Sequence, residues 1–440
     1  MLRHLRERSY YWLTNYLPDK ETADNAWFSV IDGMLYTIMV GLTQPFMNLY
    51  AMALGASDPM LGFLASWPAL VGLLAQFPSA IFTERLHQIR TSLLRWGFAH
   101  RINYLFFALI PFLPLSGVNK AWIFIILVTA MNFPAVVVNT MWTQLMGKLF
   151  PGRARAQVFA DRSFLVSIVT LIFLLISGPI LDAIPYPYNF STVFGIGFLA
   201  LMASLYSVSR LKEKQVISYS PLDEEEQPLP AAKVSPFSGM SSVLKDKPFL
   251  ALTFALFVMH IGFGISGAMW TIFYRRQLLL SGTEIARISI ISTATTVIWY
   301  RFVPRIIERV GSKGAFLLGI ALYAPFPFLI ASVNPENLWP LWFYCIFDGL
   351  AGATYNLSFF NVILESAHDE AHRPSYLAFF NTCISLPGVI FPMIGIEIFM
   401  RLGGIDARPV FRIAGSVRIL AVLLFGGILM YTRKKEKGSA

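Results

Sequence analysis

The chain is a succession of apolar stretches, each about twenty residues long and separated by short polar segments. An α-helix needs roughly 20 apolar residues to cross about 30 Å of hydrocarbon, and a helix satisfies all its backbone polar groups without water. The pattern therefore predicts an all-α membrane protein with twelve transmembrane helices. They cover residues 27–53, 59–82, 92–115, 121–146, 158–182, 190–209, 249–273, 285–307, 314–333, 339–364, 376–400 and 410–431.

The composition agrees with a membrane protein. Hydrophobic residues make up 56% and charged residues only 14% of the 440 positions, whereas soluble domains are about 25% charged. Cys345 and Cys383 both lie inside apolar stretches. We therefore expect them to be packing residues and not a disulfide or metal ligands, and we expect no cofactor and no metal.

The net charge of +10 points to membrane topology and not to nucleic acid. Nucleic-acid binding needs basic residues clustered on a folded surface, but here they occupy short gaps between apolar stretches. Lys and Arg are concentrated in alternate gaps, as in cytoplasmic loops. We therefore expect a multi-pass protein of the cell (inner or plasma) membrane with both termini in the cytoplasm.

The polar segments divide the chain into parts. Residues 1–26 place apolar side chains among Arg3, Arg6 and Arg8, which predicts an amphipathic segment on the inner leaflet, with a disordered basic tail as the alternative. Residues 211–247 contain an acidic run, Asp223 to Glu226, and several prolines, as linkers do. The linker separates a six-helix bundle over 27–210 from another over 248–432, and a basic tail follows at 433–440.

The two predicted bundles resemble each other. Similar residues recur at nearly equal separations at the ends of the second and eighth spans, before the fifth and eleventh, and within the fourth and tenth. The pairs are Glu84-Arg85 with Glu308-Arg309, Arg155 with Arg373, and Asn139 with Asn356. The agreement between three separate places indicates a duplicated six-helix unit.

Twelve spans, two similar halves and the turn "ERVGSK", Glu308 to Lys313, together resemble the major facilitator superfamily of secondary transporters. The first-half turn, "TERLHQIR", has His87 in place of the glycine. The segment "NTMWTQLMGKLFPGRARAQVFADR", with Trp142 and Arg155, is similar to many bacterial members without an assigned substrate. The resemblance implies two pseudo-symmetric six-helix bundles and transport by alternating access. We expect a monomer in the lipid bilayer.

The resemblance also implies a gate on the cytoplasmic side. Glu308 would approach the start of the fifth helix near Gln157, and Glu84 the start of the eleventh, because helix N-termini attract negative charge. A purely topogenic basic turn is the alternative. The gate residues would be Glu84, Arg85, Arg155, Glu308, Arg309, Gly311, Lys313 and Arg373.

In this superfamily the first, fourth, seventh and tenth helices line a central cavity, and each of these spans carries polar residues here. Charged side chains at membrane depth are costly and are candidates for function. Helical spacing places Asp32 with Tyr36 and Thr43, and Asn132 with Asn139 and Thr143, on single faces. The candidates for binding substrate and protons are Asp32, Tyr36, Asn132, Asn139, His260, Asp348 and Tyr355.

Each candidate also has a structural alternative. Asp32 could cap a helix or lie at the interface, His260 could bond a carbonyl, and the two asparagines could hold helices together. Arg101, with His100 beside it, is expected to snorkel or to pair helices.

Protonatable groups in a cavity favour proton coupling, and a lining rich in aromatic residues favours a lipophilic or amphipathic substrate. We therefore expect proton-coupled efflux of such a molecule, cationic if the two aspartates attract it. Uptake or exchange of a small metabolite is the alternative. The chain carries no HExxH or GxSxG motif, so an enzyme, like a membrane scaffold, is a less favoured class.

Overall fold

The computed structural model describes residues 14, 17, 19–86, 88–150, 152–213, 240–366 and 373–438, which are almost entirely helical. The chain divides into two compact units. One comprises Met1–Met60, Leu70–Ser218 and Ser281–Arg287, and the other Leu61–Ala69, Tyr219–Leu280 and Ile288–Ala440. Most of the predicted amphipathic segment and linker lies outside the described residues.

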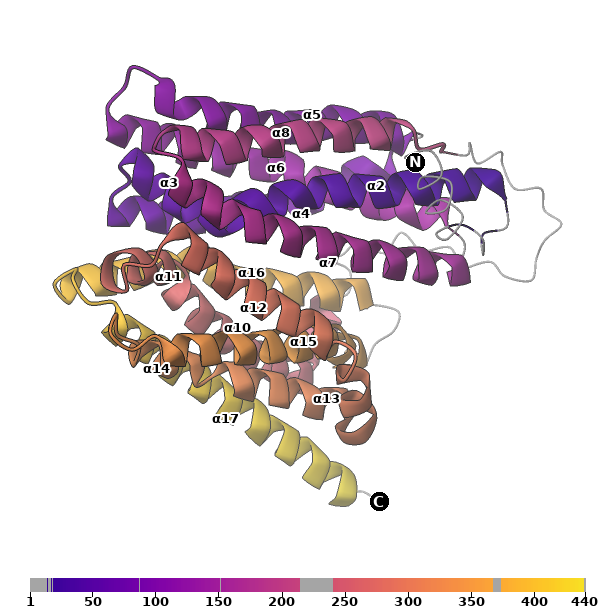
Figure 1. The fold of residues 1–440 in the computed structure, drawn as a ribbon. Helices are drawn as coiled ribbons and strands as arrows, with labels where there is room; N and C mark the ends of the chain where they lie inside the picture. Colours follow the sequence, from indigo (N-terminus) through magenta and orange to yellow (C-terminus); the bar gives the residue numbers. More distant parts are fainter. Residues whose placement is uncertain are drawn as a thin grey trace. The chain divides into compact units, whose positions relative to one another are not determined.

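The first half of the chain forms six long helical passages, each made of one helix or of consecutive helical pieces (Figure 1). In the unit that they build, α2 packs against α7 and α8, and α5 packs against α6 and α8. Their bounds are α2 Lys20–Thr43 with η1 Gln44–Phe46 and α3 Met47–Leu54, α4 Asp58–Glu84, α5 Ile89–Leu109 with η2 Ile110–Phe112, α6 Gly117–Leu149, α7 Gly152–Ala183, and α8 Tyr188–Ser209.

The second half forms six further passages. In this unit α10 packs against α16 and α17, and α13 packs against α15. The bounds are α9 Met240–Lys245, α10 Lys247–Gly267 with α11 Met269–Ile272 and η3 Phe273–Gln277, α12 Gly282–Trp299, α13 Val303–Tyr323 with α14 Phe326–Ala331, α15 Trp339–Ser366, α16 Arg373–Arg401, and α17 Arg408–Gly438.

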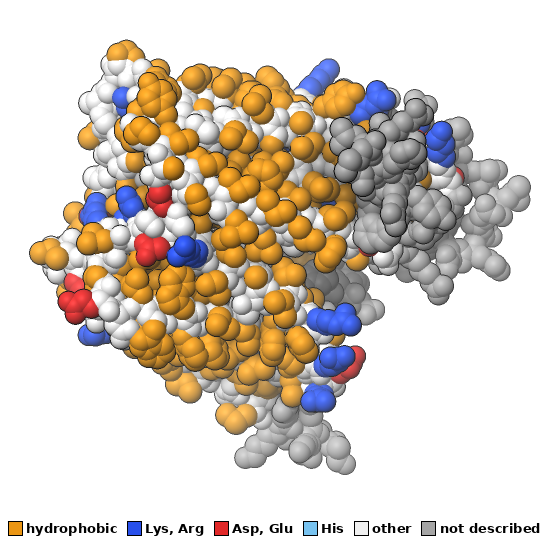
Figure 2. All heavy atoms as spheres, in the orientation of Figure 1, with side chains coloured by type: hydrophobic (Ala, Val, Ile, Leu, Met, Phe, Trp, Pro, Cys, Tyr) orange, Lys and Arg blue, Asp and Glu red, His pale blue; other side chains and the backbone are white. Residues whose placement is uncertain are grey.

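Within the described residues, nine of these passages are long and apolar enough to cross a membrane. The other three predicted spans are α5, α12 and α15, which are helical but more polar. Helix α5 carries Arg95 and Arg101, α12 has only 18 residues, and α15 contains Asp348. On the face drawn in Figure 2, hydrophobic side chains are spread along the helices, as expected of a surface in contact with lipid.

Proline accompanies two of the breaks in the long helices. Pro45 lies in η1, between α2 and α3, and Pro325 separates α13 from α14. A proline removes one backbone donor and crowds the preceding turn, so these apolar stretches continue as shorter helical pieces. Helix α6 instead continues through Pro134.

The two halves begin their first long helix in the same way. Asp19 accepts a hydrogen bond from the Thr22 backbone N–H at 2.8 Å, and Asp246 accepts one from the Phe249 backbone N–H at 3.0 Å. An aspartate three residues ahead of the donor satisfies a backbone group that the helix leaves free. The repeated cap agrees with the duplication inferred from the sequence.

The eighth predicted span, 285–307, differs from the structure. Helix α12 ends at Trp299, and the residues from Val303 open α13 instead, with a proline in its first turn. The chain then turns at Gly311, whose φ of 75° and ψ of 164° interrupt the helical geometry. This conformation is nearly restricted to glycine, which explains the glycine of the "ERVGSK" turn.

We predict that Gly311→Ala destabilises the protein by about 1–3 kcal/mol because of its backbone conformation. Gly195, inside α8, is the matched control: a Cβ at either glycine meets no atom within 4 Å, and only Gly311 has a positive φ. Thermal unfolding of the purified protein in detergent should show a lower Tm for the first variant alone. Equal Tm values for the two variants would contradict the account.

Candidate functional site

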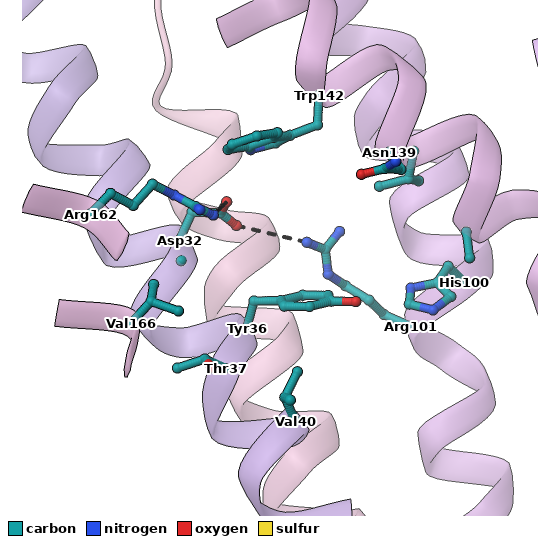
Figure 3. A pocket seen from close by; sticks show the side chains of 13 residues that line it. Asp32, Tyr36, Thr37, Val40, His100, Arg101, Asn139, Trp142, Arg162 and Val166 are labelled. Atoms are coloured by element: carbon teal, nitrogen blue, oxygen red, sulfur yellow. Dashed lines mark ion pairs between the residues drawn. The ribbon is translucent and has the colours of Figure 1, made fainter. Parts of the chain in front are cut away.

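A cavity of about 340 Å³ lies inside the first unit, between α2, α5, α6 and α7. Figure 3 shows its labelled lining residues pointing toward one another from these four helices. The lining combines charged, polar, aromatic and aliphatic side chains. They are Asp32, Gly33, Tyr36, Thr37, Val40, His100, Arg101, Ala135, Val138, Asn139, Trp142, Arg162 and Val166.

Asp32 is the centre of the charged part of this lining. Its Oδ1 lies 3.8 Å from Nη2 of Arg101, and both side chains are buried (Figure 3). Ser204, on α8, bridges the pair: its hydroxyl donates to Asp32 Oδ1 at 2.6 Å and accepts from Arg101 Nη2 at 3.0 Å. Three helices therefore meet at one buried charge pair.

A second arginine approaches Asp32 from α7. Nη2 of Arg162 lies 3.9 Å from Asp32 Oδ2, and its Nε donates to the Ser29 carbonyl at 3.2 Å. The Arg162 guanidinium also lies over the Trp142 ring, with its carbon 4.5 Å from the ring centroid, which is a favourable cation–π geometry. Asp32 is thus flanked by two guanidinium groups.

Glycines leave room for both arginines. A Cβ built at Gly33 would lie 2.8 Å from the Arg162 guanidinium carbon, and one at Gly97 would lie 2.5 Å from Arg101 Nη1. Both distances are shorter than real side-chain carbons show, so a side chain at either position would require the guanidinium to shift. Each glycine therefore leaves room for the guanidinium in its observed position.

The fourth predicted span, α6, contributes one face to the cavity. Ala135, Val138, Asn139 and Trp142 follow the helical spacing and all line it. Asn132 lies two turns before Asn139 and is not part of the lining, and its amide donates to the Val128 carbonyl of its own helix at 2.7 Å. The cavity thus includes Asn139 and leaves out Asn132.

Of the two residues predicted to share a face of α2 with Asp32, one lines the cavity and the other does not. Tyr36 lines the cavity one turn after Asp32. Thr43 is fully buried and donates to the Met39 carbonyl at 2.9 Å, so it stabilises its own helix.

The two arginines of the cavity were not among the predicted binding residues. Arg101 and Arg162 come from the third and fifth spans, whereas the resemblance directed attention to the first, fourth, seventh and tenth. Arg101 does not snorkel, because its side chain is 5% exposed and lies among helices. Both residues could have been selected from the sequence, because an arginine inside an apolar span is a candidate for function.

In the second unit, the structure brings two candidates together. His260 Nε2 lies 3.3 Å from the Tyr355 hydroxyl, and its Nδ1 lies 2.8 Å from the Leu256 carbonyl. The imidazole therefore joins α10 to α15 and is also tied to its own helix.

Asp348 lies apart from that pair. Its Oδ2 accepts a short hydrogen bond from the Ser292 hydroxyl of α12, and its Oδ1 lies 3.4 Å from the Tyr344 hydroxyl. No Lys or Arg within 4 Å of this carboxylate is found among the described residues. Asp348 is therefore held by hydroxyl groups, unlike Asp32.

The second unit also buries an arginine that the sequence did not single out. Arg418, on α17, donates to the Ser266 hydroxyl at 2.6 Å and to the Gly262 carbonyl at 3.3 Å. Its guanidinium carbon lies 4.5 Å from the Phe263 ring centroid. These contacts fasten α17 to α10.

The predicted gate residues lie at helix ends. Glu84 and Arg85 are exposed where α4 ends, and Glu308 and Arg309 are exposed just before the turn at Gly311. The side chains of Arg155 and Arg373, and His87, lie outside the described residues. Lys313 is half-buried in α13.

The family of the chain follows from a comparison with family models. The model described as Major Facilitator Superfamily matches residues 31–392 and also residues 252–440. The chain belongs to the major facilitator superfamily. The match over most of the length makes it a multi-pass membrane transporter of a small molecule, and its fold is that of two six-helix bundles with twelve helices.

Solved structures of other superfamily transporters share this fold. The nucleoside transporter NupG aligns with a TM-score of 0.68 and 14% identity over 93% of this chain and 99% of its own. A bacterial homologue of the human lysosomal transporter Spinster aligns with a TM-score of 0.62 and 14% identity over 93% and 96%. No curated protein sequence matches the chain.

We predict strong coupling between Asp32 and Arg101 in the stability of this superfamily member. Asp32→Asn leaves the buried Arg101 and the half-buried Arg162 without their carboxylate, which should cost about 3 kcal/mol or more. Combining it with Arg101→Gln should destabilise by less than the sum of the single changes, by about 0.5–3 kcal/mol. Thermal unfolding of the four proteins measures this difference.

The control is the exposed pair of Asp24 and Lys212, which lie 3.9 Å apart. Exposed ion pairs contribute about 1 kcal/mol or less, so Asp24→Asn and Lys212→Gln should have small and additive effects. Additive effects at Asp32 and Arg101 would show that the buried pair is not coupled.

Proposed function

We propose that the chain is a proton-coupled transporter that exports an amphipathic small molecule by alternating access. The observation that carries the proposal is Asp32, a carboxylate buried between two arginines beside a cavity. A proton on Asp32 removes the charge that attracts both guanidinium groups. Protonation and substrate binding therefore act on the same side chains, as coupling requires.

The cavity suits a molecule with an apolar body and a polar group. Val40, Val138 and Val166 form an aliphatic part, and Tyr36 and Trp142 add aromatic rings. Its volume of about 340 Å³ falls at the small end of ligand pockets, which span about 300–1,000 Å³. A small amphipathic substrate matches this lining.

The cavity does not support the cationic substrate considered from the sequence. Asp32 is already paired with Arg101 and Arg162, so it does not offer a free negative charge. Asp348 belongs to the other unit, where hydroxyl groups hold it.

A second candidate is uptake of a small polar metabolite by the same fold. His100 and Asn139 favour it, since both line the cavity and offer hydrogen-bonding groups beside the charges. The direction of flux under an imposed proton gradient distinguishes uptake from export. In either case we place the chain in the cell membrane as a monomer, with both termini in the cytoplasm.

We predict that Asp32→Asn removes the dependence of transport on the proton gradient, because the amide cannot bind and release a proton at this position. The measurement is substrate flux in proteoliposomes with and without a pH gradient. Asp24→Asn, on the same helix and at a partly exposed ion pair, should retain the dependence. Gradient-driven flux by the Asp32 variant at the wild-type rate would refute the role of Asp32.

We also propose that Glu308 stabilises the state that is closed to the cytoplasm, through the start of the fifth helix. Glu308 is exposed just before the turn at Gly311, so its carboxylate can reach groups outside its own helix. A charge near a helix N-terminus contributes about 0.3–1 kcal/mol.

Glu308→Gln should accordingly increase the cytoplasmic accessibility of the cavity by a modest factor. Asn139→Cys, in a background without Cys345 and Cys383, reports accessibility through its rate of labelling by a membrane-impermeant thiol reagent. Glu336→Gln, at another exposed glutamate, is the control. Unchanged labelling in the Glu308 variant would leave this turn with a topogenic role only.

A further inference from the structure

Building on the transport function proposed above, we infer that the cavity beside Asp32 recognises a small aromatic molecule with one negative charge, typified by an aromatic carboxylate. Three features of the cavity support this substrate class: its charge balance, the free donors of Arg101, and the rings beside them.

The charge balance of the lining favours an anion. Arg101 and Arg162 contribute two positive charges, and Asp32 is the only carboxylate among the thirteen lining residues. Both arginines stand more than 3.5 Å from the Asp32 oxygens, at 3.8 and 3.9 Å. Buried charge without a full complement of partners is costly. An anionic group in the cavity would balance the second arginine.

Arg101 retains hydrogen-bond donors for that group. A guanidinium has five N–H donors. Arg101 is 4% exposed, its Nη2 donates to Ser204, and its Nε has no hydrogen-bond partner among the described residues. Such an unsatisfied buried donor is unfavourable, and a carboxylate is the ligand that matches a guanidinium with two parallel hydrogen bonds.

Aromatic side chains border the charged groups. In Figure 3 the rings of Tyr36 and Trp142 lie on opposite sides of the Asp32–Arg101 pair in the view shown, and Asn139 lies near Arg101. Rings of this kind prefer planar, apolar partners. An aromatic body packed against the lining rings would carry its carboxylate toward Arg101, and a cavity of about 340 Å³ has room for one or two fused rings.

The test compares ligands that share an aromatic body and carry an anionic, neutral or cationic group. Benzoate and 1-naphthoate are titrated into the detergent-purified full chain beside their neutral amides and the corresponding cationic methylamines, and thermal shift gives the affinities. The expected result is binding of at least one carboxylate roughly tenfold or more tightly than its amide and amine, since hydrogen bonds to charged groups contribute more than neutral ones. Equal or tighter binding of the amides or amines, or no binding of either carboxylate, would overturn the anion preference.

Matched variants locate the site. Arg101→Gln should lose the preference for the carboxylate, whereas Arg95→Gln, at an exposed arginine of the same helix, should keep it. Because the Arg101 variant can also weaken folding, Asn139→Asp provides a second test: it adds a negative charge to the lining and should weaken carboxylate binding roughly tenfold relative to binding of the neutral amide by the same variant. Unchanged preference in the Asn139→Asp variant would place the ligand elsewhere.

Flux in proteoliposomes separates this inference from the proposed function. Proton-coupled movement of the amides or amines without the carboxylates would leave a transporter with a different substrate class. Carboxylate binding that depends on Arg101 but produces no flux would instead contradict the transport role and preserve the anion site.

Discussion

The burial of Asp32 between two arginines is the interaction on which the first unit depends. It brings α2, α5 and α7 to one point, and Ser204 adds α8 through a bridging hydroxyl. Charges removed from water must be paired or they destabilise the fold. The helices therefore cannot move apart at this point without a compensating proton or ligand. This requirement links the packing of the unit to its proposed transport cycle.

The second unit also buries charged side chains, but it does not pair them with each other. Arg418 is buried without a carboxylate within 4 Å among the described residues. A serine hydroxyl, a backbone carbonyl and an aromatic ring contact it, and its Nε has no hydrogen-bond partner among those residues. Asp348 is held by hydroxyl groups. The duplicated halves share their helix order and the N-cap of their first long helix, but their polar interiors have diverged. Our proposal of proton binding therefore concerns the first unit.

Much of the architecture could be predicted from the sequence, because the length of an apolar stretch indicates whether it can span the bilayer and the distribution of Lys and Arg indicates its orientation. The turn at Gly311 also followed from the motif. Helical spacing placed Asp32 with Tyr36 on one face, and both line the cavity, but it grouped Asn139 with Asn132, which does not. The partners of Asp32 could not be predicted. Arg101 and Arg162 lie on separate helices far along the chain from Asp32, and helical periodicity says nothing about which faces of different helices meet. Glycine at positions 33 and 97 becomes meaningful only once the guanidinium groups beside it are located.

The most direct test of the account is a structure of the chain with 1-naphthoate bound. The account predicts the carboxylate within hydrogen-bonding distance of Arg101 and the rings beside Tyr36 and Trp142. A ligand bound away from Asp32 and both of its arginines, with their ion pairs unchanged, would contradict it.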